Sequence, residues 1–598
     1  MLKRVNRLQS IILLLIIWTL SCTPQAGSVK DVMDGVVTRF YDTMDENELS
    51  SLTDEKIMQL LTVDEKRILA THYWMFDVNM PATVSIMRDV DQQNIPFWLE
   101  KAGFEKTDLI VRNEEYTYEV WQKNFDPGRV ALGINGFDMH RPHYFVAVGP
   151  QKAGQKLILS HFYPENQHIE RMDSGAFTYH DWDELVLTEV PEEMKGLQLL
   201  TTIRGRAREA HLINAFRKTP FPSSKQPDQI MLTWGEDPRT TQSVQWRCNT
   251  SVKNSAIKFW PAEGEEQTEA VQQAAVLQVM EDRLLQNDRF VHRFSVVLKN
   301  LKADTKYLYR VGDPSGGPWS GIHHFKTAVK KGQPFSFIYF GDTHRSPQWG
   351  KLINKAFERH PQCDFFTIGG DVVSTGLYRD DWDKLFEYSA DVISERPLMP
   401  TLGNHDSQDG LGVWMYRDLF DLPENGPSEL EPERTYSFNY GNALFLMVDA
   451  TADNQINTGW LRQQLSGSTA TWKFAVFHFP PYVFDGEFDT DYKEIREQWG
   501  ALFDEYHVDM VLSGHVHHYM RTKPVYNQQV KADPSQGTVY IISIGIPNRK
   551  FDMPARDFIA KGFGGEMLYQ TIEIDGGQLV YKAYNLDGDV RDELTITK

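Results

Sequence analysis

Five apolar runs in the C-terminal half of the chain each end in residues of metal-ligand type. The runs are FSFIYFGDTH, CDFFTIGGD, LMPTLGNHD, KFAVFHFPPY and VDMVLSGHVH. They deliver, in order, Asp342 and His344, Asp371, Asn404 to Asp406, His478, and His515 and His517. The first three ends lie roughly thirty residues apart, which is about one strand, helix and strand. Because the carboxyl ends of strands in such sheets face one crevice, we expect these side chains to meet.

Each of these residues has an ordinary structural explanation when it is taken alone. An aspartate after glycine often caps a helix or shapes a turn, Asn404 can cap a helix, and a histidine at a strand end can be solvated. Five such coincidences at five strand ends favour a shared site instead.

The residue types indicate a site for two metal ions. Carboxylate, amide and imidazole ligands without sulfur suit Mn, Fe, Zn or Co. Seven ligands exceed one tetrahedral site but suit two metals if one carboxylate bridges them. Two such metals activate water and hold phosphoryl oxygens. His405 is then left over, and a protonated imidazole there could donate to a leaving oxygen.

Length and charge set the wider frame. A chain of 598 residues exceeds one core and predicts three or four domains. Its formal net charge of −20 argues against nucleic acid as a binding partner, because phosphate backbones are bound by clustered Lys and Arg.

The first 22 residues read as an export signal. Lys3, Arg4 and Arg7 precede an apolar stretch at 11–18 that is shorter than a membrane span, and Ser21 and Cys22 follow. This resembles the lipobox of bacterial lipoproteins, although Leu20 stands one place too close to the cysteine. We expect an exported cell-envelope protein, held at a membrane only by a lipid on Cys22. A plain cleaved signal peptide is the alternative.

The sequence of residues 30–215 predicts a separate α+β module, and we identify no chemical motif in it. Thr62 to Glu65 fits a capping box, and later runs read as strands. Asp138, His140 and His143 lie close together, but we interpret them as surface or structural residues. The remaining cysteines, Cys248 and Cys363, predict two buried small side chains rather than a disulfide framework.

The residue pattern of the sequence changes at 221–328. Short runs rich in β-branched and aromatic residues, such as QIMLTWGEDP and SVQWRCNT, alternate with turn residues. This spacing predicts a β-sandwich, and its end resembles a fibronectin type III-like domain.

The C-terminal motifs resemble those of the calcineurin-like metallophosphoesterases, and more narrowly the purple acid phosphatases. The chain carries GNHD at 403–406, HFPPY at 478–482 and GHVHHYMRTKPVYN at 514–527, with YSFNYGNALFLMVDA between the third and fourth motifs. The resemblance runs from about Phe221 to the C-terminus. It implies an α/β/β/α metallophosphoesterase sandwich at 334–598, preceded by the fibronectin-like domain and the α+β module.

The resemblance also implies roles for residues. It places Asp342, Asp371 and His517 on a first metal, and Asp371, Asn404, His478 and His515 on a second, with Asp371 as the bridge. His405 would be the general acid, Asp406 its possible orienting partner, and a metal-bound hydroxide the nucleophile.

Three departures from the family pattern bear on these roles. The tyrosine that gives purple acid phosphatases their colour would stand three residues after Asp371, where this chain has Ser374. The first motif is the Asp-x-His of other metallophosphoesterases, so we predict that His344 completes the first metal site and that the protein is not purple. The last motif has Met520 in place of glutamate.

The first hypothesis for the substrate is a small phosphomonoester. Arg345, Tyr482 and His518 lie beside the motifs and are candidates for contact with it, with packing or solvated roles as alternatives. A phosphodiesterase on the same metals, or a noncatalytic surface scaffold, are the competing functions. Iron, manganese and zinc are the candidate metals.

Overall fold

The computed structural model describes residues 27–140, 142–152, 154–164, 167–180, 185–407, 411–484 and 492–598. The predicted export signal, with Cys22, lies outside these residues. In the described part of the chain, no helix combines the length and apolar character that a membrane crossing requires.

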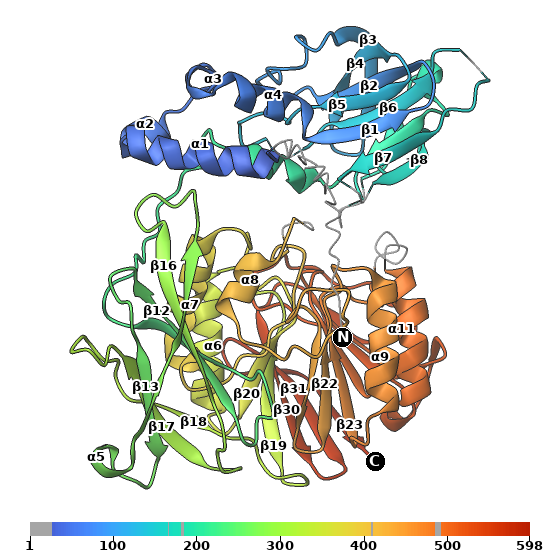
Figure 1. Cartoon of the computed structure of the whole chain (residues 1–598). Helices are drawn as coiled ribbons and strands as arrows, with labels where there is room; N and C mark the ends of the chain where they lie inside the picture. Colours follow the sequence, from blue (N-terminus) through green and yellow to red (C-terminus); the bar gives the residue numbers. More distant parts are fainter. Residues whose placement is uncertain are drawn as a thin grey trace, which may run out of the picture.

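The first part of the chain folds into a mixed module (Figure 1). Its helices are α1 (Val29–Thr43), α2 (Glu46–Ser50), α3 (Asp54–Leu60) and α4 (Val63–Thr71). Three strands form one sheet in the order β5 (Gly128–Leu132), β1 (Trp74–Val78) and β7 (Leu159–Tyr163). Seven form another in the order β8 (His168–Arg171), β10 (Gln198–Thr201), β6 (Phe145–Pro150), β2 (Ala82–Asp89), β4 (Thr117–Phe125), β3 (Glu105–Asn113) and β9 (Leu187–Glu189). The predicted α+β character is confirmed.

Local sequence signals of this module act as predicted. The Thr62 side chain accepts from the backbone of Glu65, and the Glu65 side chain accepts from the backbone of Thr62, so α4 has its capping box. His143 is buried and stacks against Tyr73, and His140 pairs with Asp89 at 2.9 Å. These contacts lie within the module, as the structural interpretation of both histidines predicts.

The module is joined tightly to the domain that comes next in the chain. Leu284, from that domain, packs in the same apolar core as α1 and α4. Arg217 forms ion pairs with Asp282, which belongs to the same domain as Leu284, and with Asp380 of helix α7. Its guanidinium lies 3.6 Å from the ring centre of Tyr378. Three parts of the chain therefore meet at one arginine.

A β-sandwich follows, as predicted. One sheet has the order β11 (Asp228–Thr233), β12 (Gln242–Asn249), β16 (Phe290–Leu298) and β15 (Val276–Glu281). The other has the order β14 (Val271–Ala274), β13 (Ala256–Pro261), β17 (Lys306–Gly312) and β18 (His323–Lys326), with the short helix α5 (Glu266–Glu269) before β14. Cys248 is buried in β12, and Cys363 is buried in the following domain, so both cysteine predictions are confirmed.

The C-terminal part is a second, larger sandwich of two sheets. Five strands run in the order β20 (Phe365–Ile368), β19 (Phe335–Phe340), β30 (Leu568–Asp575), β31 (Gln578–Asn585) and β32 (Val590–Thr597). Seven run in the order β21 (Tyr436–Tyr440), β22 (Ala443–Met447), β23 (Trp472–Val476), β24 (Met510–Ser513), β28 (Val539–Ile542), β25 (Tyr519–Thr522) and β29 (Ile559–Phe563). A small ribbon pairs β26 (Val525–Tyr526) with β27 (Gln529–Val530).

Helices cover both outer faces of this sandwich. They are α6 (Pro347–Arg359), α7 (Arg379–Ile393), α8 (Trp414–Leu419), α9 (Asn454–Ser466) and α11 (Lys493–Tyr506). Between the sheets, the ring of Phe337 meets those of Phe445 and Phe474 edge to face. On the outer face of the seven-stranded sheet, Trp499 of α11 packs on Phe477. The α/β/β/α arrangement predicted for this part is therefore present (Figure 1).

Buried charges fix the small sandwich to α7. Arg247 of β12 donates to Asp228 at 2.8 and 2.7 Å and to Asp383 of α7 at 2.8 Å. Arg379, also on α7, donates to Asp288 at 2.8 Å. Arg247 and Asp383 are 2% and 1% exposed, so each charge depends on its partner.

This ion pair predicts a large cost of neutralising Asp383. Asp383→Asn keeps the shape but leaves Arg247 short of one buried counter-charge, so stability should fall by about 3 kcal/mol. The measurement is urea unfolding followed by tryptophan fluorescence. The exposed pair of Asp237 with Arg239 is the control, and Asp237→Asn should cost less than about 1 kcal/mol. Equal effects of the two substitutions would contradict the assignment.

Candidate metal centre

Strand ends bring the predicted ligands together. Asp342 and Asp371 follow β19 and β20, which are parallel neighbours, and His478 and His515 follow β23 and β24, which are also parallel neighbours. The run before Asn404 differs from the prediction, because it is not a regular strand. It forms a single bridge at Leu398 and a few backbone hydrogen bonds alongside β20.

The two aspartates are held in the same way. One carboxylate oxygen of Asp342 accepts from the backbone N–H of His515 at 2.8 Å, and one of Asp371 accepts from that of His405 at 2.9 Å. The other oxygen, Oδ2, points among imidazoles: that of Asp342 lies 3.1 Å from Nε2 of His517, and that of Asp371 lies 3.2 Å from Nε2 of His478. Oδ2 of Asp342 is buried without a hydrogen-bond donor.

Imidazole nitrogens also face one another. Nε2 of His344 lies 3.3 Å from Nε2 of His517, and Nδ1 of His515 lies 3.2 Å from Nε2 of His478. The amide oxygen of Asn404 lies 3.1 Å from the same nitrogen of His478. The nitrogen and oxygen lone pairs of these side chains converge on one region. This arrangement fits a shared cation better than it fits hydrogen bonds between the side chains.

The potential ligands form overlapping groups. One group contains Asp342, His344 and His517, and another contains Asp371, His478 and His515. A third group joins Asp371 to His344 and His405, so Asp371 lies between the two sets. The donor set therefore fits two metal ions with Asp371 between them, and Gly369 holds the ring of His478 through its carbonyl oxygen at 2.9 Å.

The electrostatics of the centre are those of a buried anionic pocket. Burial raises the pKa of Asp371, but the adjacent histidines outweigh this and hold that pKa well below its usual range. Burial lowers the pKa of His478, and Asp371 more than compensates, raising it to about 9. Burial, and then the charge of His478, lower the pKa of His515 to about 3. The carboxylates of Asp342 and Asp371 therefore stabilise positive charge at the centre.

The backbone of the centre is strained and closely packed. His344, Asp371 and His515 have φ angles of 44°, 49° and 68°, in the left-handed region that non-glycine residues rarely occupy. A Cβ on Gly403 would lie 2.2 Å from Oδ1 of Asp371, and one on Gly514 would lie 2.1 Å from Oδ1 of Asp342. The glycines before Asn404 and His515 are therefore required for the aspartates to fit.

His405 is oriented differently from the prediction. Its Nδ1 lies 2.8 Å from the carbonyl oxygen of Ser374. The carboxylate of Asp406 accepts instead from the backbone N–H groups of Gly403, at 2.9 Å, and Val373, at 3.0 Å. Asp406 therefore ties the two loops that carry Asp371 and Asn404, and Ser374 orients the imidazole.

The three candidate substrate contacts have other partners. Arg345 forms an ion pair with Asp381 at 2.5 Å and remains partly exposed. The ring of Tyr482 packs on that of Tyr540, with centroids 4.7 Å apart. His518 is buried next to Phe484, and burial followed by the charge of His517 lowers its pKa to about 4. Of these three, Arg345 combines a charge with exposure beside the centre.

Two departures from the family motifs have structural counterparts. The hydroxyl of Ser374 donates to the carbonyl oxygen of His344 at 3.2 Å. In the last motif, Arg521 donates to both oxygens of Asp592 at 2.6 and 2.9 Å, and Tyr519 donates to the same carboxylate at 2.7 Å. An aspartate from β32 is therefore the acidic partner of this arginine.

Sequence reasoning did not identify the two aromatic rings that flank His515, a member of the second group of potential ligands. Phe479 and Tyr492 stack on each other, and both meet the ring of His515 edge to face, at 4.9 and 5.7 Å. Phe479 stands inside the HFPPY motif and was within reach of sequence reasoning. Tyr492 lies beyond that motif with no local signal.

Two family models match the chain. Residues 227–327 match the N-terminal domain of purple acid phosphatases, and residues 335–519 match the calcineurin-like phosphoesterases. The second match contains the candidate ligands from Asp342 to His517.

Curated relatives agree with these matches. Purple acid phosphatase 23 of Arabidopsis thaliana is 28% identical over 281 residues, which are 41% of this chain and 60% of that protein. An uncharacterized protein of Mycobacterium tuberculosis is 25% identical over 337 residues, which are 50% of this chain and 62% of that one. The chain thus spans about three fifths of the length of these relatives. The Fe(3+)-Zn(2+) purple acid phosphatase 12 of A. thaliana is 23% identical over 336 residues, which are 52% of this chain and 68% of that protein.

A solved structure shares the fold. A purple acid phosphatase isolated from yellow lupin seeds superimposes with a TM-score of 0.54 at 15% identity, and covers 89% of this chain and 91% of its own. That coverage exceeds the stretch from residue 227 to the C-terminus, so the likeness of fold reaches into the α+β module. The chain is purple acid phosphatase-like: it joins a domain of the purple acid phosphatase N-terminal type to a domain of the calcineurin-like phosphoesterase type.

Proposed function

We propose that the chain is a two-metal phosphoesterase that hydrolyses phosphomonoesters. The convergence of Asp342, Asp371 and His478 with the histidines of the last motif carries this proposal. One relative is named as an Fe(3+)-Zn(2+) enzyme, so iron and zinc are the first metals to test, followed by manganese. When bound, such metals lower the pKa of water and polarise phosphoryl oxygens.

The chain's own residues position the ester. Asp342, His344 and His517 would hold the first metal, Asn404, His478 and His515 the second, and Asp371 both. Arg345, which is partly exposed, is the candidate to contact a phosphoryl oxygen or the ester group, provided that it gives up part of its pairing with Asp381. Tyr482 and His518 would act by shaping the wall.

His405 is proposed as the general acid. Because Nδ1 faces the carbonyl oxygen of Ser374, it carries a proton, and Nε2 is then the atom that exchanges a proton with the leaving group. The T-shaped contact with the ring of His344, with centroids 4.9 Å apart, keeps His405 beside the centre.

Export and lipidation at Cys22 remain predictions from the sequence. A phosphodiesterase would use the same metal ligands. A surface scaffold would need these ligands but would have no use for His405. The dependence of turnover on the leaving group and on bound metal separates these functions.

Removing His405 should slow the chemistry of poor leaving groups most. In His405→Ala, we expect kcat for an alkyl phosphate such as glycerol phosphate to fall by about 10²- to 10⁴-fold, and kcat for p-nitrophenyl phosphate to fall less, because nitrophenolate leaves without a proton. The bound metal content should not change. His168→Ala, at an exposed histidine of the α+β module, is the control. Equal losses for both substrates would contradict an acid role.

Metal removal separates an enzyme from a scaffold. The chelated protein should lose all turnover and recover it with Fe, Zn or Mn, because the converging ligands then regain their cations. The assay compares p-nitrophenyl phosphate with bis-p-nitrophenyl phosphate. Preference for the diester would favour the phosphodiesterase, and a fully loaded protein without turnover on either ester would favour the scaffold.

His344 should complete the first metal site in place of a tyrosine. His344→Ala is expected to lower bound metal from two ions per chain towards one, measured by elemental analysis, with the fold checked by circular dichroism. The iron-loaded protein should lack an intense tyrosinate charge-transfer band in its visible spectrum. A purple protein, or unchanged metal content in the variant, would refute this assignment.

A further inference from the structure

The short segment 374–378 contacts the candidate general acid at two points. Nδ1 of His405 lies 2.8 Å from the carbonyl oxygen of Ser374, and the backbone N–H of Gly376 donates to the carbonyl oxygen of His405 at 2.9 Å. The Ser374 hydroxyl also donates to the carbonyl oxygen of His344 at 3.2 Å. Both the imidazole and the backbone of His405 are therefore placed by this one segment.

The middle of segment 374–378 fits tightly against the loop of His405. A Cβ on Gly376 would lie 1.9 Å from the carbonyl oxygen of Asp406, so the two backbones approach as closely as a glycine permits. The carbonyl oxygen of Gly376 accepts from the buried indole N–H of Trp382 at 2.9 Å. A displacement of segment 374–378 would therefore also displace the loop of His405.

The end of the segment leads into α7, and the start of this helix is held from outside the catalytic domain. Tyr378 occupies the N-cap position, but its side chain makes no capping hydrogen bond. The carboxylate of Asp282, from the small sandwich, accepts instead from the backbone N–H of Arg379 at 3.0 Å. An aspartate of another domain thus satisfies one of the N–H groups that a helix leaves open at its start.

Arg217 binds both sides of this helix start. Its guanidinium donates to Asp282 and, at 2.9 Å, to Asp380 in the first turn of α7. The same guanidinium lies 3.6 Å from the ring centre of Tyr378. The Arg217 side chain is 14% exposed, and those of its two carboxylate partners are 5% and 10% exposed. Because these charges are largely removed from water, separating them would cost more than separating an exposed pair.

We propose that Arg217 is a positioning residue for the general acid. It stacks on Tyr378 and fixes the start of α7, and segment 374–378 transmits this constraint to the imidazole of His405. The inference rests on the proposed function, because it requires His405 to act as the acid. Arg217 precedes residue 227, where the first family match begins, so a residue outside both matched domains would help to set the catalytic geometry.

The test removes the ring on which Arg217 stacks and leaves both ion pairs in place. In metal-loaded, full-length Tyr378→Leu, we expect kcat for glycerol phosphate to fall by about tenfold, because a misplaced acid protonates the leaving oxygen poorly. For p-nitrophenyl phosphate, kcat should change by less than about twofold, since nitrophenolate leaves without a proton. KM and bound metal should not change. Tyr378→Phe keeps the ring and should behave as wild type.

Hydrogen–deuterium exchange gives a readout that does not depend on turnover. The peptide that covers segment 374–378 should exchange faster in Tyr378→Leu than in wild type or Tyr378→Phe, because the hydrogen bond from Gly376 to His405 is then held less firmly. Arg217→Lys is the second variant, in case Tyr378→Leu does not fold. It keeps the charge but loses the flat guanidinium, so it should show the same difference between the two substrates and the same faster exchange.

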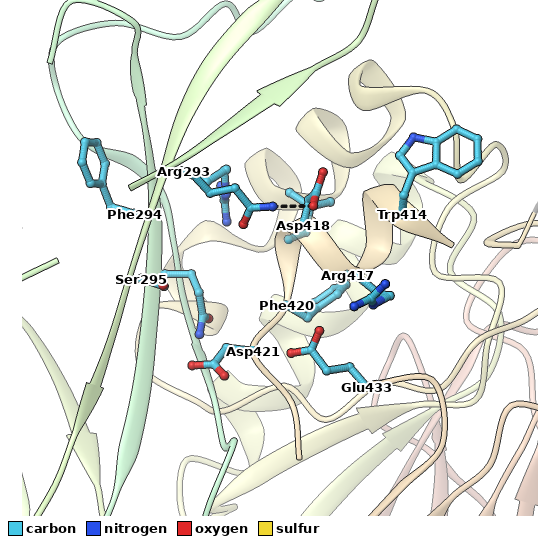
Figure 2. Close-up of a pocket in the computed structure, with 12 residues that line it drawn as sticks. Arg293, Phe294, Ser295, Trp414, Arg417, Asp418, Phe420, Asp421 and Glu433 are labelled. Carbon is cyan, nitrogen blue, oxygen red and sulfur yellow. Dashed lines mark hydrogen bonds between the residues drawn. The ribbon is translucent and has the colours of Figure 1, made fainter. Parts of the chain in front are cut away.

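A matched control weakens another contact between the small sandwich and the catalytic domain. Gln278 of β15 donates to Asp418 of α8, and this hydrogen bond is drawn as a dashed line in Figure 2. Gln278→Ala removes the bond without touching segment 374–378. It should therefore retain both rates and the wild-type exchange of that segment.

The outcomes separate this inference from the proposed function. The inference is overturned, and the function stands, if His405→Ala loses mainly glycerol phosphate turnover while Tyr378→Leu and Arg217→Lys lose both activities equally or neither. Unchanged exchange of segment 374–378 in both variants would also overturn it. Equal losses for both substrates in His405→Ala would refute the acid role itself, and the positioning role with it.

Discussion

The centre of this molecule depends on burying two carboxylates at the ends of two adjacent parallel strands. Asp342 and Asp371 are both removed from water, and neither could remain charged there without positive partners. A backbone N–H takes one oxygen of each, and imidazoles surround the other. The glycines, the left-handed residues and the loop ties around these strand ends all serve that arrangement.

Much of this could be predicted because it has a local signature. A buried strand followed by Gly-Asp or Gly-His is readable in a single sequence, and so are the alternation of strands in the small sandwich and the capping box at Thr62. Parallel neighbours then bring such ends together by topology alone, which is why the convergence of these side chains could be predicted from the sequence.

Other features could not be predicted because they join residues far apart in the chain. The partner of Arg521 is Asp592, on the last strand, and the buried partner of Arg247 is Asp383, on a helix of another domain. No spacing rule links such positions. The run before Asn404 was read as a strand from its apolar residues, but only part of it pairs with β20. The carboxylate of Asp406 accepts hydrogen bonds from backbone N–H groups, and a motif of side chains gives no sign of such bonds.

The position of Leu284 has a consequence for motion. This residue belongs to the small sandwich but completes the apolar core of the first helices, while Arg217 pairs at once with Asp282 and Asp380. A hinge at this junction would have to draw a buried leucine into water and separate a largely buried arginine from two carboxylates. Relative movement of the α+β module and the sandwich would therefore carry a free-energy cost at this junction.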